Sequence, residues 1–221
     1  MVRHAAERGE RVKAFGSGHS FTAIAVSDSH LLDLSDYGRV LEVDQERGLV
    51  TVQAGIKLTQ LCEELYARGL AMEDMGDVAY QSIAGATSTG THGTGVTFGC
   101  IATQIRAMRI VVGDGSVLQC SADENPEVFR AARVGVGALG IVSTITLQCS
   151  PAFNLHALEQ AKPLDAVMQD LDSYVDGNQH FEFFWQPGAR NAFTKQNNRT
   201  AEPEQALTKW QNFRDDVLIG D

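Results

Sequence analysis

Apolar and polar residues alternate along several short segments of the first 150 residues, and this pattern predicts a domain built largely from strands. Short alternating runs that end at glycine, proline or aspartate are typical of half-buried strands. Turn sequences at 45–48 and 113–115 predict two hairpins. Strands are expected over 11–15, 31–34, 40–44, 49–54, 105–112, 116–120 and 141–148.

Fewer segments have helical spacing. Gly69 ends the first long helical pattern, and Ser82 is expected to cap a short helix that follows it. Asn125 and Pro126 are typical of a cap and a first helical residue. Residues 2–9 have the character of the last turns of a helix, followed at once by a strand. Helices are expected over 58–68, 83–87, 127–133 and 164–174.

The character of the sequence changes after Ser150 and Pro151. Glycine-rich loops disappear, an aromatic strand is expected over 180–185, and about the last thirty residues are polar and weakly patterned. We therefore expect a domain boundary near residue 150. One domain would occupy 1–150, with its N-terminal part missing, and an incomplete second domain would occupy 151–221.

Composition narrows the class of protein. Apolar residues make up 43% and charged residues 21% of the 221 residues, which is ordinary for a globular chain with a core. A net charge of −10 argues against general nucleic-acid binding, because phosphate contacts need a basic face. The sequence has neither an apolar run long enough for a membrane span nor a signal peptide, so a cytoplasmic location is expected. Four widely spaced cysteines predict reduced thiols and no metal site.

Two glycine-rich loops carry the most chemical information. The first, Gly16-Ser17-Gly18-His19-Ser20-Phe21, directly follows a predicted strand, and the second occupies 87–95. Glycine lets a backbone approach a ligand closely, and free N–H groups and hydroxyls in such loops bind anions. Alone, the first loop could equally be a connecting turn, and His92 in the second could be a solvated side chain. Together they indicate a ligand with a long phosphate-bearing body.

A third glycine cluster, 135–140, matches the G-x-G-x-x-G pattern of dinucleotide-binding folds, and Glu159 follows at about the expected distance. That motif requires a strand before the glycines and a helix after them. Here the predicted order is the reverse, so we reject this interpretation. A tight helix-to-strand crossing beside a ligand is expected instead. Walker-type and G-x-S-x-G motifs are also absent from the sequence.

The order of these motifs resembles the flavin-binding domain of the vanillyl-alcohol oxidase (PCMH-type) superfamily. The segments Thr89-Gly90-Thr91-His92-Gly93 and 137–141 resemble its aldonolactone oxidoreductase branch, which includes gulonolactone and D-arabinono-1,4-lactone oxidases and is related to alditol oxidase. The resemblance implies an α+β fold. A PCMH-type FAD-binding domain of two subdomains would be followed by the start of an α+β cap domain for the substrate.

The same resemblance implies FAD as cofactor. The first loop would surround the pyrophosphate, with His19 in the position of the histidine often bonded to the 8α-methyl of the flavin. Ser82 and the second loop would line the pyrophosphate and ribityl chain, and Ile141 would present its backbone to the adenine. The residues expected to hold FAD are Gly16, Ser17, Gly18, His19, Ser20, Ser82, Thr87, Ser88, Thr89, Gly90, Thr94, Gly95 and Ile141. Segment 76–82 contains no cysteine, so at most one covalent flavin bond is expected.

The activity implied is oxidation of a CH–OH group of a sugar lactone of the D-arabinono- or L-gulono-1,4-lactone type, by hydride transfer to flavin N5. Electrons would pass to O₂ or another acceptor, as in an oxidase or a dehydrogenase. No substrate base can be assigned within these residues. An alditol oxidase and a truncated, non-catalytic FAD-binding remnant remain alternatives, and peripheral membrane association, known in some relatives, stays open.

Overall fold

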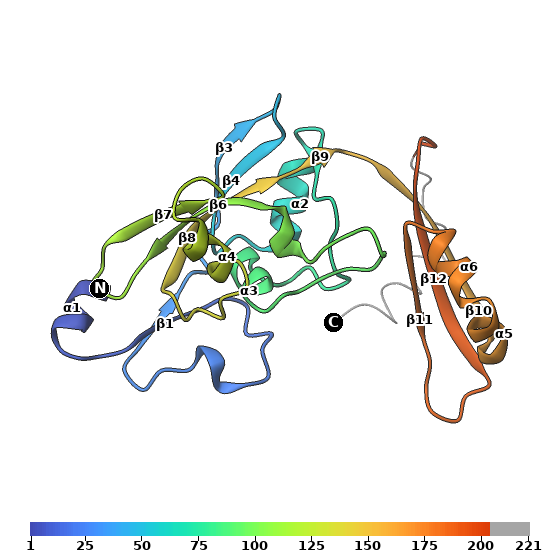
Figure 1. The fold of residues 1–221 in the computed structure, drawn as a ribbon, viewed down its shortest axis with the longest axis horizontal. Coiled ribbons are helices and arrows are strands. Elements are labelled where there is room, and N and C mark those ends of the chain that lie inside the picture. Colours follow the sequence, from blue (N-terminus) through green and yellow to red (C-terminus); the bar gives the residue numbers. More distant parts are fainter. Residues whose placement is uncertain (204–221) are drawn as a thin grey trace.

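The largest element of the fold is a five-stranded antiparallel sheet. The structure is a computed structural model that describes residues 1–203, and Figure 1 shows its fold. The predicted strands agree with the observed ones to within about two residues. In spatial order the strands are β3 (Val40–Asp44), β4 (Leu49–Gln53), β8 (Ile141–Gln148), β6 (Ile105–Val111) and β7 (Val117–Ser121).

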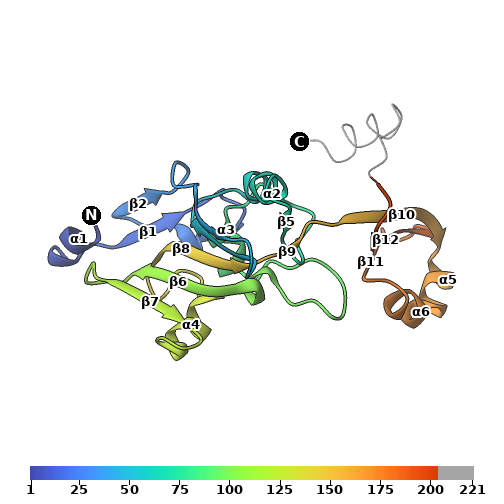
Figure 2. The same cartoon turned by 90° about the horizontal axis from the view of Figure 1, so that it is seen from above.

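A smaller layer lies beside this sheet at the N-terminal end. Helix α1 (Val2–Glu7) leads into β1 (Val12–Phe15), which pairs in parallel with β2 (His30–Asp33) through the short helix η1 (Ala23–Ala25). Figures 1 and 2 both show β1 next to β8 but outside the large sheet. The chain therefore forms two layers here, and the loop that follows β1 lies at the end of the smaller layer.

Helices α2 (Leu58–Tyr66) and α3 (Ile83–Ser88), with η2 (Ile101–Gln104), pack on the sheet. Leu61, Ile83, Val50 and Ile145 are fully buried in the shared core. Ser82 caps α3 as predicted, since its Oγ accepts a hydrogen bond from the Gly85 N–H at 3.3 Å.

Helix α4 (Pro126–Ala132) begins at the predicted proline with Asn125 at the N-cap position as predicted, but the Asn125 side chain makes no hydrogen bond to the helix end. Asn125 adopts a left-handed conformation with φ 49° and makes no side-chain cap. Its amide instead donates to the carbonyl of Gln119 at 2.8 Å, which ties the helix to β7. A side chain that finds a partner across a turn is no longer available to the helix end.

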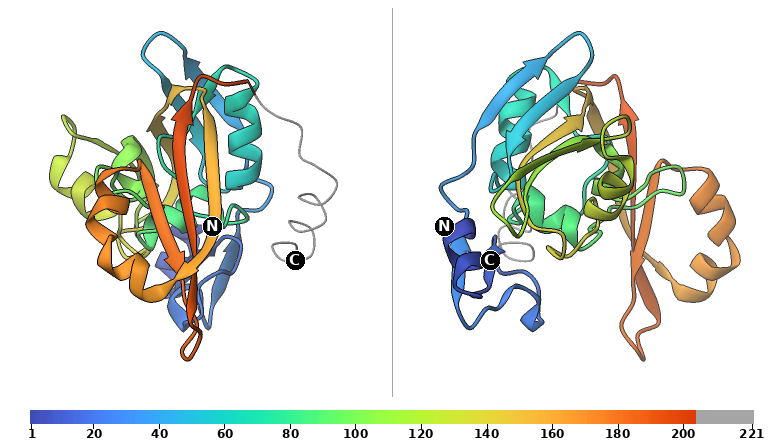
Figure 3. Two further views of the ribbon diagram at one scale, coloured as in Figure 1. Left: turned by 90° about the vertical axis from the view of Figure 1, so that its right-hand side faces the viewer. Right: turned by 60° about the vertical axis from the view of Figure 1, so that its left-hand side comes forward.

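A separate three-stranded sheet follows the pair formed by β5 (Leu70–Ala71) and β9 (Ser150–Pro151). Figure 3 shows the two helices α5 and α6 on one face of this sheet. The helix expected over 164–174 is two short helices that meet at Asp170, and the strand over 154–163 was not predicted. The elements are β10 (Asn154–Pro163), α5 (Leu164–Gln169), α6 (Leu171–Asp176), β11 (His180–Phe184) and β12 (Asn191–Thr200), in the strand order β10-β12-β11.

The α+β class is confirmed, whereas residues 204–221 of the expected second domain lie outside the described residues. Within 1–203, no helix combines the length and apolar character that crossing a membrane requires.

Candidate functional site

A cavity of about 360 Å³ lies between the β1–β2 layer and the large sheet. Three segments far apart in sequence meet around it: the loop after β1, the start of α3 and the turn that leads into β8. Nine of the predicted cofactor-binding residues line the cavity, namely Gly16, Ser17, Gly18, His19, Ser20, Ser82, Ser88, Thr89 and Ile141. The fold therefore brings together most of the residues that the two glycine-rich loops contribute.

Contact between the first loop and α3 depends on the missing side chain of Gly16. A Cβ atom built at this position would lie 2.1 Å from Ser82 Oγ and 3.1 Å from Ser82 Cβ. Contacts this short are not tolerated, so glycine is required for the close approach of the two backbones. Ser82 is 3% exposed and is held by its cap to α3, so it cannot easily move away.

Ser17 is held by a residue that the sequence analysis missed. The Lys57 ammonium donates to Ser17 Oγ at 2.6 Å, and the Ser17 hydroxyl donates to the carbonyl of Tyr80 at 2.6 Å. Lys57 is the N-cap residue of α2, and its backbone pairs with that of Ser82 in a single antiparallel β-bridge. No sequence motif points to Lys57, because this residue belongs to neither glycine-rich loop. Ser17 therefore fixes the loop, and its hydroxyl is already engaged.

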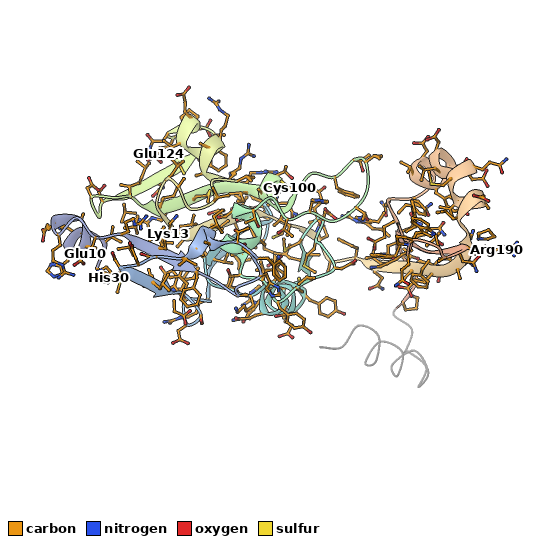
Figure 4. The ribbon with its side chains drawn as sticks, turned by 90° about the horizontal axis from the view of Figure 1, so that it is seen from below. Glu10, Lys13, His30, Cys100, Glu124 and Arg190 are labelled. Carbon is orange, nitrogen blue, oxygen red and sulfur yellow. The ribbon has the colours of Figure 1, made fainter. Side chains whose placement is uncertain are left out.

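The donors of the first loop fit an anionic ligand. Within residues 1–203, the backbone N–H groups of Gly18, His19 and Ser20 have no acceptor in the protein, and these residues are exposed at the cavity. Lys13 on β1 also lines the cavity and adds a positive charge (Figure 4). A row of free amides in a turn is a common phosphate-binding arrangement.

Apolar residues line the remaining surface of the cavity. Side chains of Ile24, Val112, Val136 and Val142 border it, so one part is polar and donor-rich and the rest is hydrophobic. This combination fits a group that carries both phosphates and planar rings, because rings bind apolar walls and phosphates bind amides. The site is therefore suited to a dinucleotide.

The third glycine cluster borders the same cavity, although in the reverse of the dinucleotide fingerprint order. Helix α4 precedes it and strand β8 follows it, so the rejection of the G-x-G-x-x-G interpretation is confirmed. Gly137 and Gly140 line the cavity together with Ile141. The crossing from helix to strand places the backbone beside the ligand site, as expected.

Four predicted residues lie outside this cavity. Thr87 is 1% exposed, and its hydroxyl donates to the carbonyls of Ile83 and Ala84. Its side chain therefore stabilises α3 and does not face the cavity. Gly90 follows the helix, while Thr94 and Gly95 lie farther along the loop toward β11. Their contact with a cofactor stays a prediction.

A second cavity, of about 600 Å³, lies on the other side of the second loop. His92, Gly93 and Thr94 border it, together with Asp74 and with His180 from β11. Burial raises the pKa of the Asp74 carboxyl, while the Gly93 N–H and the nearby imidazole of His180 oppose that rise. Sequence reasoning missed Asp74 and His180, because only the fold brings these distant residues together.

Comparison with known proteins connects this geometry to a family. The model of the family described as "FAD binding domain" matches residues 1–121, and that described as "D-arabinono-1,4-lactone oxidase" matches residues 145–219. The chain is 47% identical over 213 residues to an L-gulono-1,4-lactone dehydrogenase of Mycobacterium tuberculosis, covering 96% of this chain and 49% of that protein. It is 40% identical to an L-gulonolactone oxidase of Scyliorhinus torazame, covering 95% and 48% of the two chains.

Solved structures give the same fold. The cholesterol oxidase of Brevibacterium sterolicum superposes with a TM-score of 0.82 at 17% identity, over 93% of this chain and 44% of that one. Identity this low supports the fold alone. The chain spans about half the length of the curated relatives that it matches.

Proposed function

Because the chain belongs to the FAD-binding domain family, we propose that it is the flavin-binding part of an oxidoreductase that acts on a CH–OH group of a sugar lactone. The observation that carries this proposal is the cavity where the first glycine-rich loop, α3 and the 137–141 turn meet. The names of the relatives support a lactone of the L-gulono- or D-arabinono-1,4-lactone type as substrate.

Each wall of the cavity would hold a different part of FAD. The free amides of Gly18, His19 and Ser20 would bind the pyrophosphate, since they are its natural donors in this site. Ser88 and Thr89 would bind the ribityl side, and the backbone at Ile141 would face the adenine. Ser17 would position the loop rather than bind the phosphates directly, because its hydroxyl accepts from Lys57 and donates to the Tyr80 carbonyl. Ser82 accepts from the Gly85 N–H and would still have its hydroxyl proton to donate to the cofactor.

His19 would be the attachment point if the flavin is covalently bound. It is exposed at the cavity, so its imidazole can reach a ligand without a change in the fold. When bound, FAD supplies a hydride acceptor for oxidation of an alcohol carbon. Residues 151–203, which form the three-stranded sheet, would begin the substrate-binding domain, and the boundary near residue 150 would separate the two.

The test is a flavin titration followed by denaturation. Purified chain is titrated with FAD, desalted, and then denatured in SDS while flavin fluorescence is followed on the protein band. The proposal predicts saturable FAD binding. Fluorescence that stays with the wild-type band and is lost in His19→Ala would assign the covalent bond. Failure of soluble, folded chain to bind FAD would contradict the proposal.

A further inference from the structure

The three-stranded sheet is joined to the rest of the protein without a shared apolar core. The buried apolar cluster is made of residues between Val50 and Cys149, and within residues 1–203 none of its members comes from β10, β11 or β12. Figures 1 and 2 show this sheet at one end of the larger body, which comprises residues 1–150, with the loop that follows α3 reaching toward β11. Other contacts must therefore hold the sheet in place.

An imidazole, an ammonium and a guanidinium supply these contacts from one face of the sheet. Lys195 and Arg199 are two and four residues from the start of that row on β12, and His180 on β11 pairs with Asn197 between them, so alternation places all three side chains together. The contacts are His180 Nδ1 to the Thr94 carbonyl oxygen at 2.9 Å, Lys195 Nζ to Asp77 Oδ1 at 2.6 Å, and Arg199 Nη2 to the Glu73 carbonyl oxygen at 3.2 Å.

The surface of the body that receives these groups is acidic. Segment 73–77 carries the carboxylates of Glu73, Asp74 and Asp77 and contains no basic residue. Asp74 Oδ1 lies 3.7 Å from His180 Nδ1, and the His180 ring stacks on Phe98 of the second loop at 4.7 Å between centroids. The two parts therefore meet through complementary charge and one aromatic pair, which gives orientation more than binding strength.

The contact of Lys195 with the body can be broken at little cost. Glu182 is the cross-strand partner of Lys195 within the sheet, and its Oε1 lies 3.1 Å from Lys195 Nζ. Asp77 belongs to the body, and its side chain is 57% exposed. If the sheet moves away, the ammonium keeps Glu182 as its partner and Asp77 returns to water. An ion pair this exposed is weak and is screened by salt.

The point about which the sheet can turn lies between Ala152 and Phe153. Within residues 1–203 the polypeptide passes from the body to the sheet once, along 152–153. The Ala152 N–H donates to the Gly69 carbonyl at 2.8 Å, so this residue is fixed to the body. Phe153 is covered by the Arg199 guanidinium at 3.9 Å from the ring centroid, so this residue is fixed to the sheet.

We propose that the three-stranded sheet with its two helices is a lid, held closed over the second cavity by His180, Lys195 and Arg199 and turning at residues 152–153. The cavity of about 600 Å³ lies between segment 70–77 of the body and strands β11 and β12, so opening of the lid exposes it to solvent. Parts of a chain that meet through a polar interface, without a common hydrophobic core, are expected to move relative to one another.

Distance measurements by double electron–electron resonance on the full chain test the lid. Spin labels are attached to encoded non-natural residues, because the chain has four free cysteines. One label replaces Glu46 in the exposed β3–β4 turn, and the other replaces Arg190 in the exposed β11–β12 turn (Figure 4). We expect a closed and an open distance, with a larger open fraction at about 0.5 M NaCl than at low salt, because salt screens the exposed pair.

Two variants that remove one partner each from Lys195 should act in opposite directions. Asp77→Asn removes the partner in the body and should raise the ratio of open to closed chain about twofold to fivefold. Glu182→Gln removes the partner that Lys195 keeps in the open state, so it should lower this ratio. Asp123→Asn, in the exposed turn before α4, is the matched control and should leave the ratio unchanged.

Three results would overturn the proposal. A single distance in the wild type and in Asp77→Asn at both salt concentrations would show a rigid junction. A shift in the same direction in Asp77→Asn and Glu182→Gln would show that Lys195 does not exchange partners. A response of Asp123→Asn equal to that of Asp77→Asn would show an effect of net charge alone. The measurement needs no FAD, so its outcome is independent of the proposed function.

Discussion

Replacing Gly16 by alanine is expected to disrupt both the fold around the first cavity and the binding of FAD. The added methyl would lie 2.1 Å from Ser82 Oγ, well inside van der Waals contact. Either the hydroxyl rotates away and releases the Gly85 N–H, or the loop after β1 moves away from α3. Both responses alter a surface on which the proposed cofactor rests.

The cost can be estimated from these two responses. Loss of an N-cap hydrogen bond costs about 0.5–2 kcal/mol, and forcing an extra methyl into a packed site costs about 1–3 kcal/mol. Because the protein adopts whichever response costs less, we expect Gly16→Ala to lower the free energy of unfolding by about 1–2 kcal/mol. In a Ser82→Ala background the closest contact becomes the Cβ–Cβ separation of 3.1 Å. The penalty for Gly16→Ala should then fall by about 1 kcal/mol.

Urea denaturation of the four proteins in this cycle measures the free energies, and FAD titration measures the effect on the site. Gly113→Ala is the matched control, because Gly113 lines the same cavity but a Cβ there would have no neighbour within 4 Å. It should change stability by no more than about 0.5 kcal/mol. If Gly16→Ala proves as stable as Gly113→Ala, or if its cost is the same with and without the Ser82 hydroxyl, the close-approach argument is wrong.

Two further predictions concern charged groups around the same layer. Hydrogen bonds from Arg8 and His30 lower the pKa of Glu10 to about 2 (Figure 4). Since this is below the unfolded value of about 4.3, the stability that Glu10 contributes is present above that pH and is lost as the pH falls toward 2. Thermal denaturation of Glu10→Gln across this range should show a flatter pH dependence than the wild type, and identical curves would contradict the assignment. Lys57→Met removes the donor to Ser17 and should weaken FAD binding by about fivefold to tenfold, measured by flavin fluorescence. Unchanged affinity would show that the first loop keeps its conformation without Lys57.

The elements predictable from sequence are those whose burial alternates strongly. β4 has Val50 and Val52 fully buried on one face, and its hydrophobic pattern predicts its position well. In β10 most side chains are exposed, so its sequence has no apolar alternation to detect. Pairing with β12 along ten residues defines that strand, and such pairing depends on a distant and equally polar segment.

The candidate site was predictable only as far as its local motifs reach. The glycine-rich segments at Gly16 and Gly137 can be found in the sequence, but only their order along the chain, together with the second loop, indicates a common ligand site. Lys57, Asp74 and His180 carry no such local signal. Lys57 reaches the first loop, and Asp74 and His180 reach the second cavity, only when the fold brings α2, the segment after β5 and β11 beside the glycine-rich loops.

An experimental structure of the chain crystallised with FAD would show directly whether the first cavity is the flavin site. We predict density for the dinucleotide in the cavity between β1 and β8, with the pyrophosphate against the amides of Gly18, His19 and Ser20. Density for FAD in another part of the molecule, or a filled cavity in which these amides contact no phosphate, would contradict it.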